Sequence, residues 1–567
     1  HRECLGDAGR EPVHGRVFRN LAGDTAVDWL ATGIAETLTV DLRRTRRVRV
    51  IPPDRVRQGL RLGDAASPLE VARQVGARYA VTGSYQAAGG RLRITAQLAD
   101  AASGETIADL REDGALGEVF ELQDRVLAGV LAALGEAAPD ATPVAPPPER
   151  PGLDVFECYA RGRQRLHDFS PAGLEEAARH FEQALVLDPG FAPAHAGLGT
   201  CRMFRHIGSA DPADLDAALA HFERAAELDP GLPEVPIRLA YLYGRRRRYD
   251  DARVAADRGV AAEPDNDEAY YFRGTRHVIA AGYGFRGDYD EGLADLLRAL
   301  ELNPGAGAAA MVAAWACRLR GDPEAAARFA TLARRIERGT LRSSILTRWV
   351  GADTLLACAR LDQGRAAEAR ELAAQEVAAL PSREHVYQQS FLAQAHLALG
   401  EASLRLGDAA RALGEFGAAL AVAQAQPAMG GMRWVSIRAL AGRARALVGV
   451  RLRREAQQAL ADAQRQAEAH AEAGFEFAWT ASAPDAWRDL AAAHARLDAR
   501  EAALDSLDRA AAMGWANVAG LRADPAFAAL LAEADAARRI ERHAAPSPVS
   551  PALAARLSRL ASAHEAP

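Results

Sequence analysis

Two stretches of the chain decide its fold: AARHFEQALVLDPG at residues 177–190 and ALAHFERAAELDPG at residues 218–231. In each, Ala is followed by Phe after four residues, by a second Ala after three more, and by Pro after a further five. Small residues let two helices approach closely, the aromatic ring fills the space between them, and Pro cannot continue the second helix. The pattern therefore predicts pairs of packed helices that end at a defined turn.

The same pattern returns along the second part of the chain, which is therefore built from repeats. Its landmark prolines are Pro189, Pro230, Pro264 and Pro304, at spacings of 41, 34 and 40 residues. Later copies lose the proline and keep the other positions, as Ala412, Phe416 and Ala419 and as Ala503, Leu507 and Ala510. We expect about nine helix pairs between residues 152 and 515.

These units resemble the tetratricopeptide repeat family, whose unit is a helix-turn-helix of 34 residues. The resemblance implies an all-α solenoid, in which the first helix of each unit lines a groove that binds peptides or proteins. Aligning the units that end at Pro264 and Pro304 predicts these partner-binding residues: Glu234, Ile237, Tyr241, Arg245, Glu268, Tyr271 and Thr275. Tyr and Arg are favoured anchors of interfaces, although some of these side chains would instead pack between helices.

The first 136 residues have a mixed pattern that predicts a small α/β domain. Residues 77–100 read as a hairpin of alternating strands around Gly89-Gly90, and residues 105–113 as a third strand. RVRVIPP at residues 47–53 predicts a further strand, and helices are expected at residues 25–42, 68–75 and 118–134.

This part resembles the TolB amino-terminal domain family, which often precedes tetratricopeptide repeats in bacterial proteins. The matching motifs are VFRNLAGD at 17–24, VGARYAVTGS at 75–84, RLRITAQL at 91–98 and FELQD at 120–124. Val17 stands where the family has proline. The resemblance implies a mixed sheet and favours the periplasmic side of a bacterial membrane.

These patterns divide the chain into an α/β domain (1–136), a proline-rich linker (137–151), the repeats (152–515) and a C-terminal region (516–567). The linker reads AAPDATPVAPPPERP, which favours an extended spacer. In the last region GLRADPAFAALL at 520–531 resembles a segment that closes the last repeat. Residues 552–563 predict an amphipathic helix, either a second cap or a docking helix.

Composition excludes several kinds of chemistry. The 69 basic residues among the 567 contain no lysine, which rules out a Gly-Lys-Ser/Thr phosphate loop, a kinase lysine and a lysine Schiff base. The five cysteines form no Cys-x-x-Cys pair, and neither His-Glu-x-x-His nor Gly-x-Ser-x-Gly occurs. GYGFRG at 282–287 lacks the flanking strands of a dinucleotide site. We therefore predict no catalytic residues, no metal and no cofactor.

Charge and hydropathy also restrict the partners. The net charge is −6, and neither the part before residue 150 nor the part after it is basic, so nucleic acid is not an expected partner. Arginine runs at 41–50 and 244–251 fit solvated helix ends, or alternatively a surface for an acidic partner. No run of 18 apolar residues predicts a membrane span.

These observations favour a non-enzymatic scaffold or accessory subunit of a larger, membrane-associated bacterial assembly, with proteins or peptides as partners. We expect it in the periplasm or at the membrane on the extracytoplasmic side. Because the sequence begins at His1, we also expect a processed or truncated chain. The alternative is the sensory half of a cytoplasmic signalling protein with a kinase, cyclase or DNA-binding domain upstream. The third class of function is an enzyme whose catalytic residues are not recognised in the sequence.

Overall fold

The structure is a computed structural model. It describes residues 18–45, 48, 50–51, 56, 67–74, 76–135, 150–166, 170–209, 211–232, 234–246, 248–282, 288–338, 350–382, 388–427, 431–473, 483–544 and 550–563. The described residues form two compact units: those within 1–201 and 220–232 make the first, and those within 202–219, 233–339 and 346–567 make the second.

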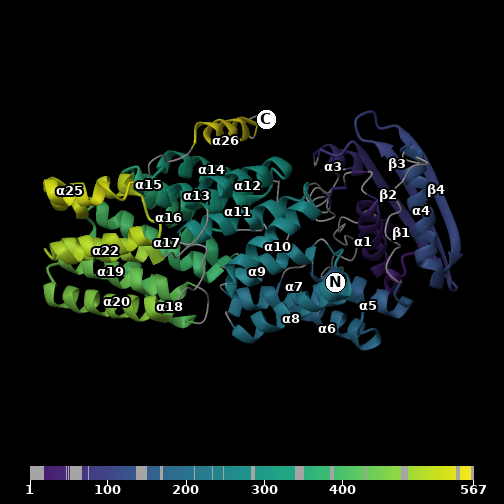
Figure 1. Cartoon of the computed structure of the whole chain (residues 1–567), viewed down its shortest axis with the longest axis horizontal. Helices are drawn as coiled ribbons and strands as arrows, with labels where there is room; N and C mark the ends of the chain where they lie inside the picture. The colour runs from purple at the N-terminus through teal and green to yellow at the C-terminus, as the bar shows by residue number, and fades with distance from the viewer. Residues whose placement is uncertain are drawn as a thin grey trace, which may run out of the picture. The chain divides into compact units, whose positions relative to one another are not determined.

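The first unit contains a four-stranded mixed sheet (Figure 1). Its strands, in spatial order, are β1 (Phe18–Asn20), β2 (Tyr79–Ala88), β3 (Arg91–Asp100) and β4 (Thr106–Ala115). β1 runs parallel to β2, whereas the other pairs are antiparallel. Gly89 and Gly90 both have positive φ in the β2–β3 turn, which glycine adopts without a steric penalty. The predicted hairpin and third strand are confirmed, while the strand expected at 47–53 lies largely outside the described residues.

One face of this sheet is covered by helices. α1 (Trp29–Arg44) and α4 (Val119–Ala133) pack against it, and the short α3 (Pro68–Gln74) lies against β2. Alternate residues of β3, such as Ile94 and Leu98, are buried under the helices because side chains of a strand point to opposite faces. Gln97 lies on the other face and binds Asp109 of β4. This one-sided core is the mixed α/β domain that the sequence predicts.

The helix after the proline-rich segment joins this core. In α5 (Leu153–Leu166), the ring of Phe156 lies 5.7 Å from that of Trp29 and 4.7 Å from that of Phe120. Arg163 of α5 lies 3.2 Å from Glu36 of α1. The first repeat helix therefore completes the hydrophobic core of the α/β domain. The predicted linker itself lies almost entirely outside the described residues.

All further regular structure among the described residues after β4 is helical. The helices of the repeat region that follow α5 are α6 (Pro171–Leu187), α7 (Ala192–Ser209), α8 (Pro212–Leu228), α9 (Glu234–Arg245), α10 (Tyr249–Ala262), α11 (Asp267–Gly282), α12 (Tyr289–Leu302), α13 (Gly307–Leu319), α14 (Pro323–Arg338), α15 (Ala352–Asp362), α16 (Ala366–Ala379), α17 (Gln388–Arg405), α18 (Ala409–Ala425), α19 (Met432–Gly449), α20 (Arg453–Ala473), α21 (Ala483–Arg496) and α22 (Arg500–Ala512). The predicted all-α solenoid after an α/β domain is confirmed.

The repeat motif has the physical role expected of it. Phe181 of α6 is fully buried, and a Cβ placed on Gly162 of α5 or Gly197 of α7 would come within 2.7 Å of its ring. Phe416 of α18 lies in the same way between Gly400 of α17 and Gly442 of α19. Glycine is needed at these positions because the aromatic ring occupies the space where a Cβ would stand.

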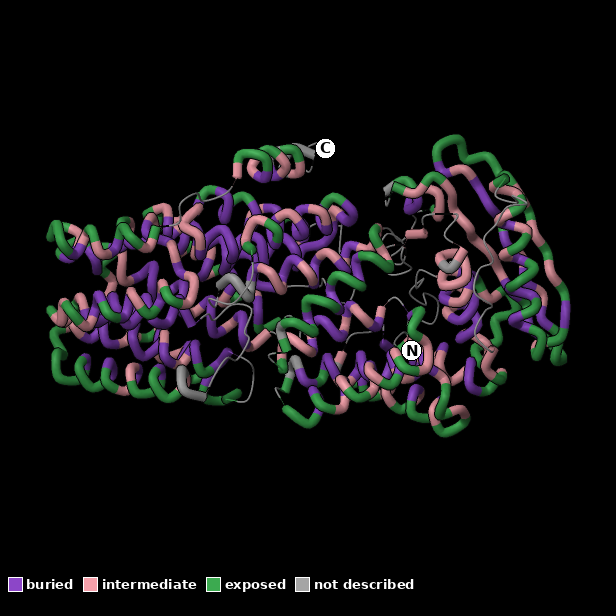
Figure 2. Tube along the Cα trace, in the orientation of Figure 1, coloured by how far each residue is buried: buried purple, intermediate pink, exposed green. Residues whose placement is uncertain are grey.

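In the second unit the odd-numbered helices α9 to α21 contact one another in succession, and each pairs with the even-numbered helix that follows it. α13 is buried along its whole length, whereas the outer side of α20 is exposed (Figure 2). The odd-numbered helices therefore form an inner layer, which from α13 to α21 has little contact with solvent. Among the described helices, none combines the length and the apolar character required to cross a membrane.

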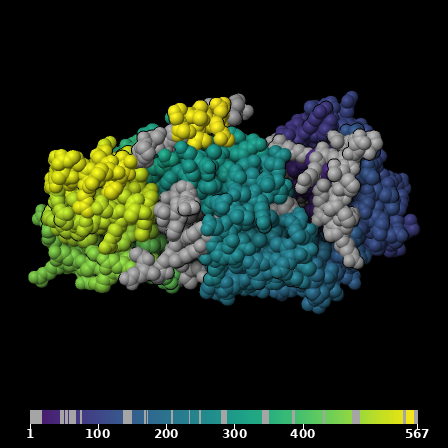
Figure 3. All heavy atoms as spheres, in the orientation of Figure 1, coloured from purple at the N-terminus to yellow at the C-terminus, as the bar shows by residue number. Residues whose placement is uncertain are grey.

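After α22 the chain leaves the repeat pattern. Short helices follow as α23 (Val518–Arg522), η5 (Pro525–Phe527), α24 (Ala528–Ala532) and α25 (Ala534–Glu541), and then α26 (Pro551–Ala563). α26 contacts α12 and α14 on the surface of the second unit (Figure 3). Leu553 and Leu557 of α26 are buried there, and Arg556 lies 3.0 Å from Glu301. The C-terminal helix therefore docks against the middle repeats.

Candidate functional site

The predicted partner-binding residues lie on α9 and α11, which contact each other in the inner layer. Ile237, Tyr271 and Thr275 are buried, whereas Glu234, Tyr241, Arg245 and Glu268 are half-buried. The structure thus brings all seven residues onto neighbouring helices. Four of them keep part of their surface exposed.

Several of these side chains join the two helices. Arg238 of α9 donates a hydrogen bond of 3.0 Å to the carboxylate of Glu268 on α11. The ring of Tyr241 lies 6.1 Å from that of Phe272 in an edge-to-face arrangement. Burial raises the pKa of the Tyr241 and Tyr271 hydroxyls, so both phenols stay neutral at physiological pH.

Arg245 is held at the end of α9 by a buried histidine. Its Nη2 lies 3.3 Å from Nε2 of His206, and Nδ1 of His206 lies 2.7 Å from the carbonyl oxygen of Asp211. Burial and the Arg245 charge both lower the pKa of His206. The neutral ring therefore accepts a hydrogen bond from Arg245 and donates one to Asp211, which fixes the position of the guanidinium.

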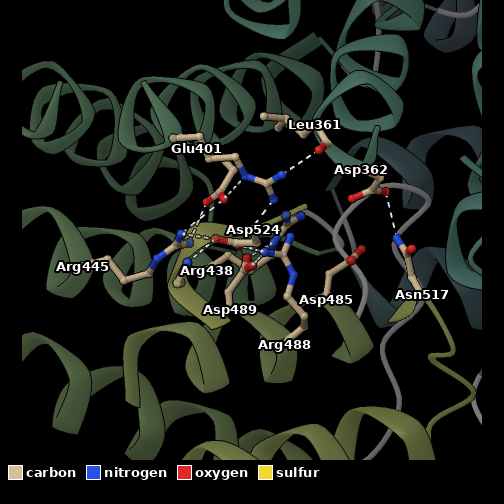
Figure 4. Close-up of polar contacts among 12 residues, drawn as sticks. Leu361, Asp362, Glu401, Arg438, Arg445, Asp485, Arg488, Asp489, Asn517 and Asp524 are labelled. Atoms are coloured by element: carbon tan, nitrogen blue, oxygen red, sulfur yellow. Dashed lines mark hydrogen bonds and ion pairs between the residues drawn. The ribbon is translucent and has the colours of Figure 1, made fainter. Parts of the chain in front are cut away.

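A second cluster, which was not predicted from the sequence, consists of buried charged side chains in the second unit (Figure 4). Five arginines with side chains no more than 11% exposed meet four carboxylates of the inner helices and one carboxylate of the C-terminal region. We call this set the ionic cluster; its members are Arg318, Arg405, Arg438, Arg445, Arg488, Asp362, Glu401, Asp485, Asp489 and Asp524. Buried charges are stable only when they are paired, which explains the equal numbers of each sign.

One end of the ionic cluster joins α13, α15 and α21. Arg318 donates hydrogen bonds of 3.0 and 3.2 Å to the two carboxylate oxygens of Asp485, and its Nε lies 2.8 Å from Asp362. Although burial opposes ionisation, the neighbouring arginines lower the pKa of Asp485. Both partners therefore remain charged at every physiological pH.

The other end joins α17, α19 and α21. Glu401 lies 2.9 Å from Arg405 and 2.7 Å from Arg445, and Arg438 lies 2.8 Å from Asp489. Burial raises the pKa of Glu401, but Arg445 and Arg405 outweigh it and hold that pKa well below its usual range.

The last carboxylate comes from residues 515–531, which we call the closing segment. Asp524 lies between Arg445 and Arg488 (Figure 4), at 3.5 and 3.4 Å, and 3.4 Å from Arg405. Asn517 of the same segment donates a hydrogen bond of 2.8 Å to Asp362. The closing segment therefore lies against the inner helices.

The ionic cluster had only a weak signal in the sequence. Charged residues interrupt otherwise apolar inner helices, as Glu401 and Arg405 do four positions apart on α17 and as Asp485, Arg488 and Asp489 do on α21. Charges at such spacing usually lie on an exposed helix face. Only the packing of five helices from distant parts of the chain distinguishes a buried set from a solvated one.

Ion pairs of the ionic cluster join the inner helices to one another and to the closing segment. Beside the ionic cluster lies a cavity lined by Cys358, Glu401, Arg438, Arg445 and Arg488, with room for about one water molecule. Burial raises the pKa of the Cys358 thiol, so the reactive thiolate is disfavoured. In the part of the chain that the structure describes, no three His, Cys, Asp or Glu residues are arranged to hold a metal ion.

Comparison with known families agrees with this architecture. Residues 17–107 match the family described as the TolB amino-terminal domain, and residues 211–274 match the tetratricopeptide repeat family. The protein therefore combines a TolB amino-terminal domain with tetratricopeptide repeats, and a solenoid of such repeats is the fold of a protein-interaction scaffold.

Individual relatives match parts of the chain. A stretch of 187 residues, 32% of the chain, is 31% identical to a Rhizobium meliloti (strain 1021) protein named "Putative adenylate cyclase 3" and covers 31% of that protein. The match thus spans about a third of the length of this curated relative.

Two solved structures align with parts of the chain at low sequence identity. A tetratricopeptide repeat protein from Parabacteroides merdae is 17% identical, with a TM-score of 0.34 over 48% of this chain and 94% of that one. The APC/C hetero-tetramer Cut9-Hcn1 is 14% identical, with a TM-score of 0.37 over 75% of this chain and 81% of that one.

Proposed function

We propose that the protein is a non-enzymatic scaffold that binds a partner protein or peptide along α9 and α11. The observation that supports this most directly is the row of half-buried side chains Glu234, Tyr241 and Arg245 on α9. Glu234 offers a carboxylate to a partner, and Tyr241 offers a large ring as an anchor. Arg245 offers a cation that His206 holds in position. Side chains of this kind, partly packed and partly exposed, are typical of interface anchors.

The finer part of the proposal concerns the setting. The TolB amino-terminal domain supports a role in the bacterial envelope, as an accessory subunit of a membrane-associated assembly on the extracytoplasmic side. In that setting the repeats would hold a second subunit.

The full-length wild-type chain, immobilised and incubated with an envelope extract of the source bacterium, tests the proposal. We expect it to enrich a defined protein, identified by mass spectrometry. Tyr241→Ala should reduce that enrichment about tenfold, because it removes the ring while leaving Ile237 and Tyr271 in the packing. The matched control is Arg253→Ala on α10, whose exposed side chain pairs with Asp257. Equal enrichment by wild type and Tyr241→Ala would reject the α9–α11 surface.

A second candidate is the sensory half of a signalling protein. The relative named as an adenylate cyclase favours it, because the matching stretch covers only a third of that protein. An antibody against the 567-residue chain should then detect a substantially larger polypeptide in the source cells, with cyclase, kinase or DNA-binding activity in the immunoprecipitate. A native polypeptide no larger than this chain, in the envelope fraction, would favour the scaffold.

A further inference from the structure

The closing segment has the conformation of a docked peptide. Its helices are five residues or shorter and are capped by its own side chains: Asn517 accepts a hydrogen bond from the amide of Gly520, and Asp524 accepts one from the amide of Ala526. The segment touches the inner layer from one end to the other. The amide of Ala516 binds the carbonyl oxygen of Leu319 on α13, and Asp524 reaches α17, α19 and α21.

Charge makes the inner helices complementary to this segment. Within the ionic cluster, the helices α13 to α21 supply all five arginines, but only the carboxylates of Asp362, Glu401, Asp485 and Asp489. Asp524 supplies the missing negative charge. The repeats by themselves therefore present an excess positive charge at the point where Arg405, Arg445 and Arg488 converge.

An apolar anchor follows the acidic residue. Phe527 is fully buried, three positions after Asp524, and Leu530 is buried three positions after that. Pro525 and Ala528 between these anchors are exposed. The buried positions of the segment thus include a carboxylate, an aromatic ring and a leucine at intervals of three residues.

The contacts of Asp524 are looser than those that hold the helices to each other. Its three arginine contacts measure 3.4 to 3.5 Å. At their closest, Arg445 lies 2.7 Å from Glu401 and Arg318 lies 3.0 Å from Asp485. At the other end of the segment Asn517 keeps a hydrogen bond of 2.8 Å. Residues 523–531 are therefore the part whose release leaves the ion pairs between the helices intact.

We propose that the inner face of α17, α19 and α21 is a second peptide-binding site, specific for an acidic residue followed three positions later by an aromatic residue, and that residues 523–531 of the same chain occupy it as an exchangeable internal ligand. A partner peptide of the same chemistry binds by displacing them. This site is separate from the α9–α11 surface, so an experiment that rejects one of the two proposals does not reject the other.

The probe is a fluorescein-labelled peptide with the sequence of residues 520–532, GLRADPAFAALLA, added to the full-length chain. In the chain, Asp524→Asn keeps an oxygen that accepts the hydrogen bond from Ala526 but removes the charge, so the internal segment binds less tightly. We expect this variant to bind the peptide at least about tenfold more tightly than the wild type does, by fluorescence anisotropy. The same peptide with Asn in place of its Asp should not bind.

Two controls separate recognition from general damage. Arg522→Ala alters an exposed side chain of the same segment that contacts Glu541, and should bind peptide as the wild type does. Arg445→Met added to Asp524→Asn should abolish the gain in binding.

If Asp524→Asn proves unfolded by circular dichroism, the wild type provides the decisive measurement. Excess unlabelled peptide should increase amide hydrogen exchange in residues 523–531 without changing that of α17 and α19. Unchanged exchange at saturating peptide would show a permanent structural cap and overturn the proposal, as would a folded Asp524→Asn variant that binds no more peptide than the wild type. A dimer in sedimentation, formed by exchange of the segment between two copies, would also overturn the proposal. It would show that the segment occupies the site of another copy and not that of its own chain.

Discussion

Arg318 on α13 and Asp485 on α21 form a buried two-point ion pair across 167 positions of sequence, with hydrogen bonds of 3.0 and 3.2 Å. A guanidinium and a carboxylate have the planar fork geometry that favours this arrangement. Because both side chains are almost fully buried, neither charge can be solvated by water if the other is lost. The pair therefore makes the packing of the middle repeats depend on the last repeat.

Removing Arg318 should destabilise the second unit strongly. We expect Arg318→Met to lower the free energy of unfolding by about 3–5 kcal/mol, because Asp485 and Asp362 would become buried charges with a partner missing. Urea unfolding followed by circular dichroism measures the change. Arg453→Met is the matched control, since its ion pair with Asp498 is exposed and should contribute less than about 1 kcal/mol. Similar losses for the two variants would contradict the role assigned to burial.

Acid should weaken the ionic cluster through Glu401. The pKa of Glu401 is held well below its usual range in the folded chain, whereas in the unfolded chain it is about 4.3. Its stabilising contribution is therefore fully present above the unfolded pKa and is lost as the pH falls below about 5 toward the folded pKa. Glu401→Gln should be less stable at pH 7 and should show a shallower loss between pH 6 and pH 4, measured by urea unfolding across that range. An equal slope for both proteins would contradict this prediction.

The glycines around Phe181 should not tolerate a methyl group. Gly197→Ala places a Cβ about 2.6 Å from the Phe181 ring, and we expect a loss of about 1–3 kcal/mol from overpacking. Combining it with Phe181→Leu should cost less than the two single changes added together, because the smaller side chain makes room. Thermal unfolding of the four proteins in this cycle measures the coupling. Gly414→Ala, on an open face of α18, should be neutral or stabilising by about 0.5–1 kcal/mol.

Phe156 should stabilise the α/β domain although it belongs to the first repeat helix. Phe156→Ala removes the ring that contacts Trp29 and Phe120, and we expect a loss of about 3–5 kcal/mol. Amide hydrogen exchange in α1 should become faster in this variant. Glu157→Ala changes the adjacent half-exposed residue and should leave α1 protected. Unchanged protection of α1 in Phe156→Ala would show that α5 does not contribute to that core.

Local features of the fold were predictable because short-range patterns determine them. The hairpin around Gly89-Gly90 follows from alternation and a turn that needs positive φ, and the helix pairs follow from Phe181 and Phe416 with their small neighbours. The candidate surface on α9 and α11 could be placed because it follows from the repeat register. The burial of Ile237, Tyr271 and Thr275 could not be predicted, because the repeat register alone does not determine how closely two helices approach.

The sequence by itself determined the class of protein: an α/β domain with the motifs of the TolB amino-terminal domain, followed by helical repeats that contain no lysine. Periodicity and turn chemistry act over a few residues, so a single chain displays them directly. Tertiary structure alone decided which charges are buried and where residues 515–531 lie. Arg318, Glu401 and Asp524 look like ordinary surface charges in the sequence, and they become a balanced internal cluster only because five inner helices and the closing segment exclude water from the same place.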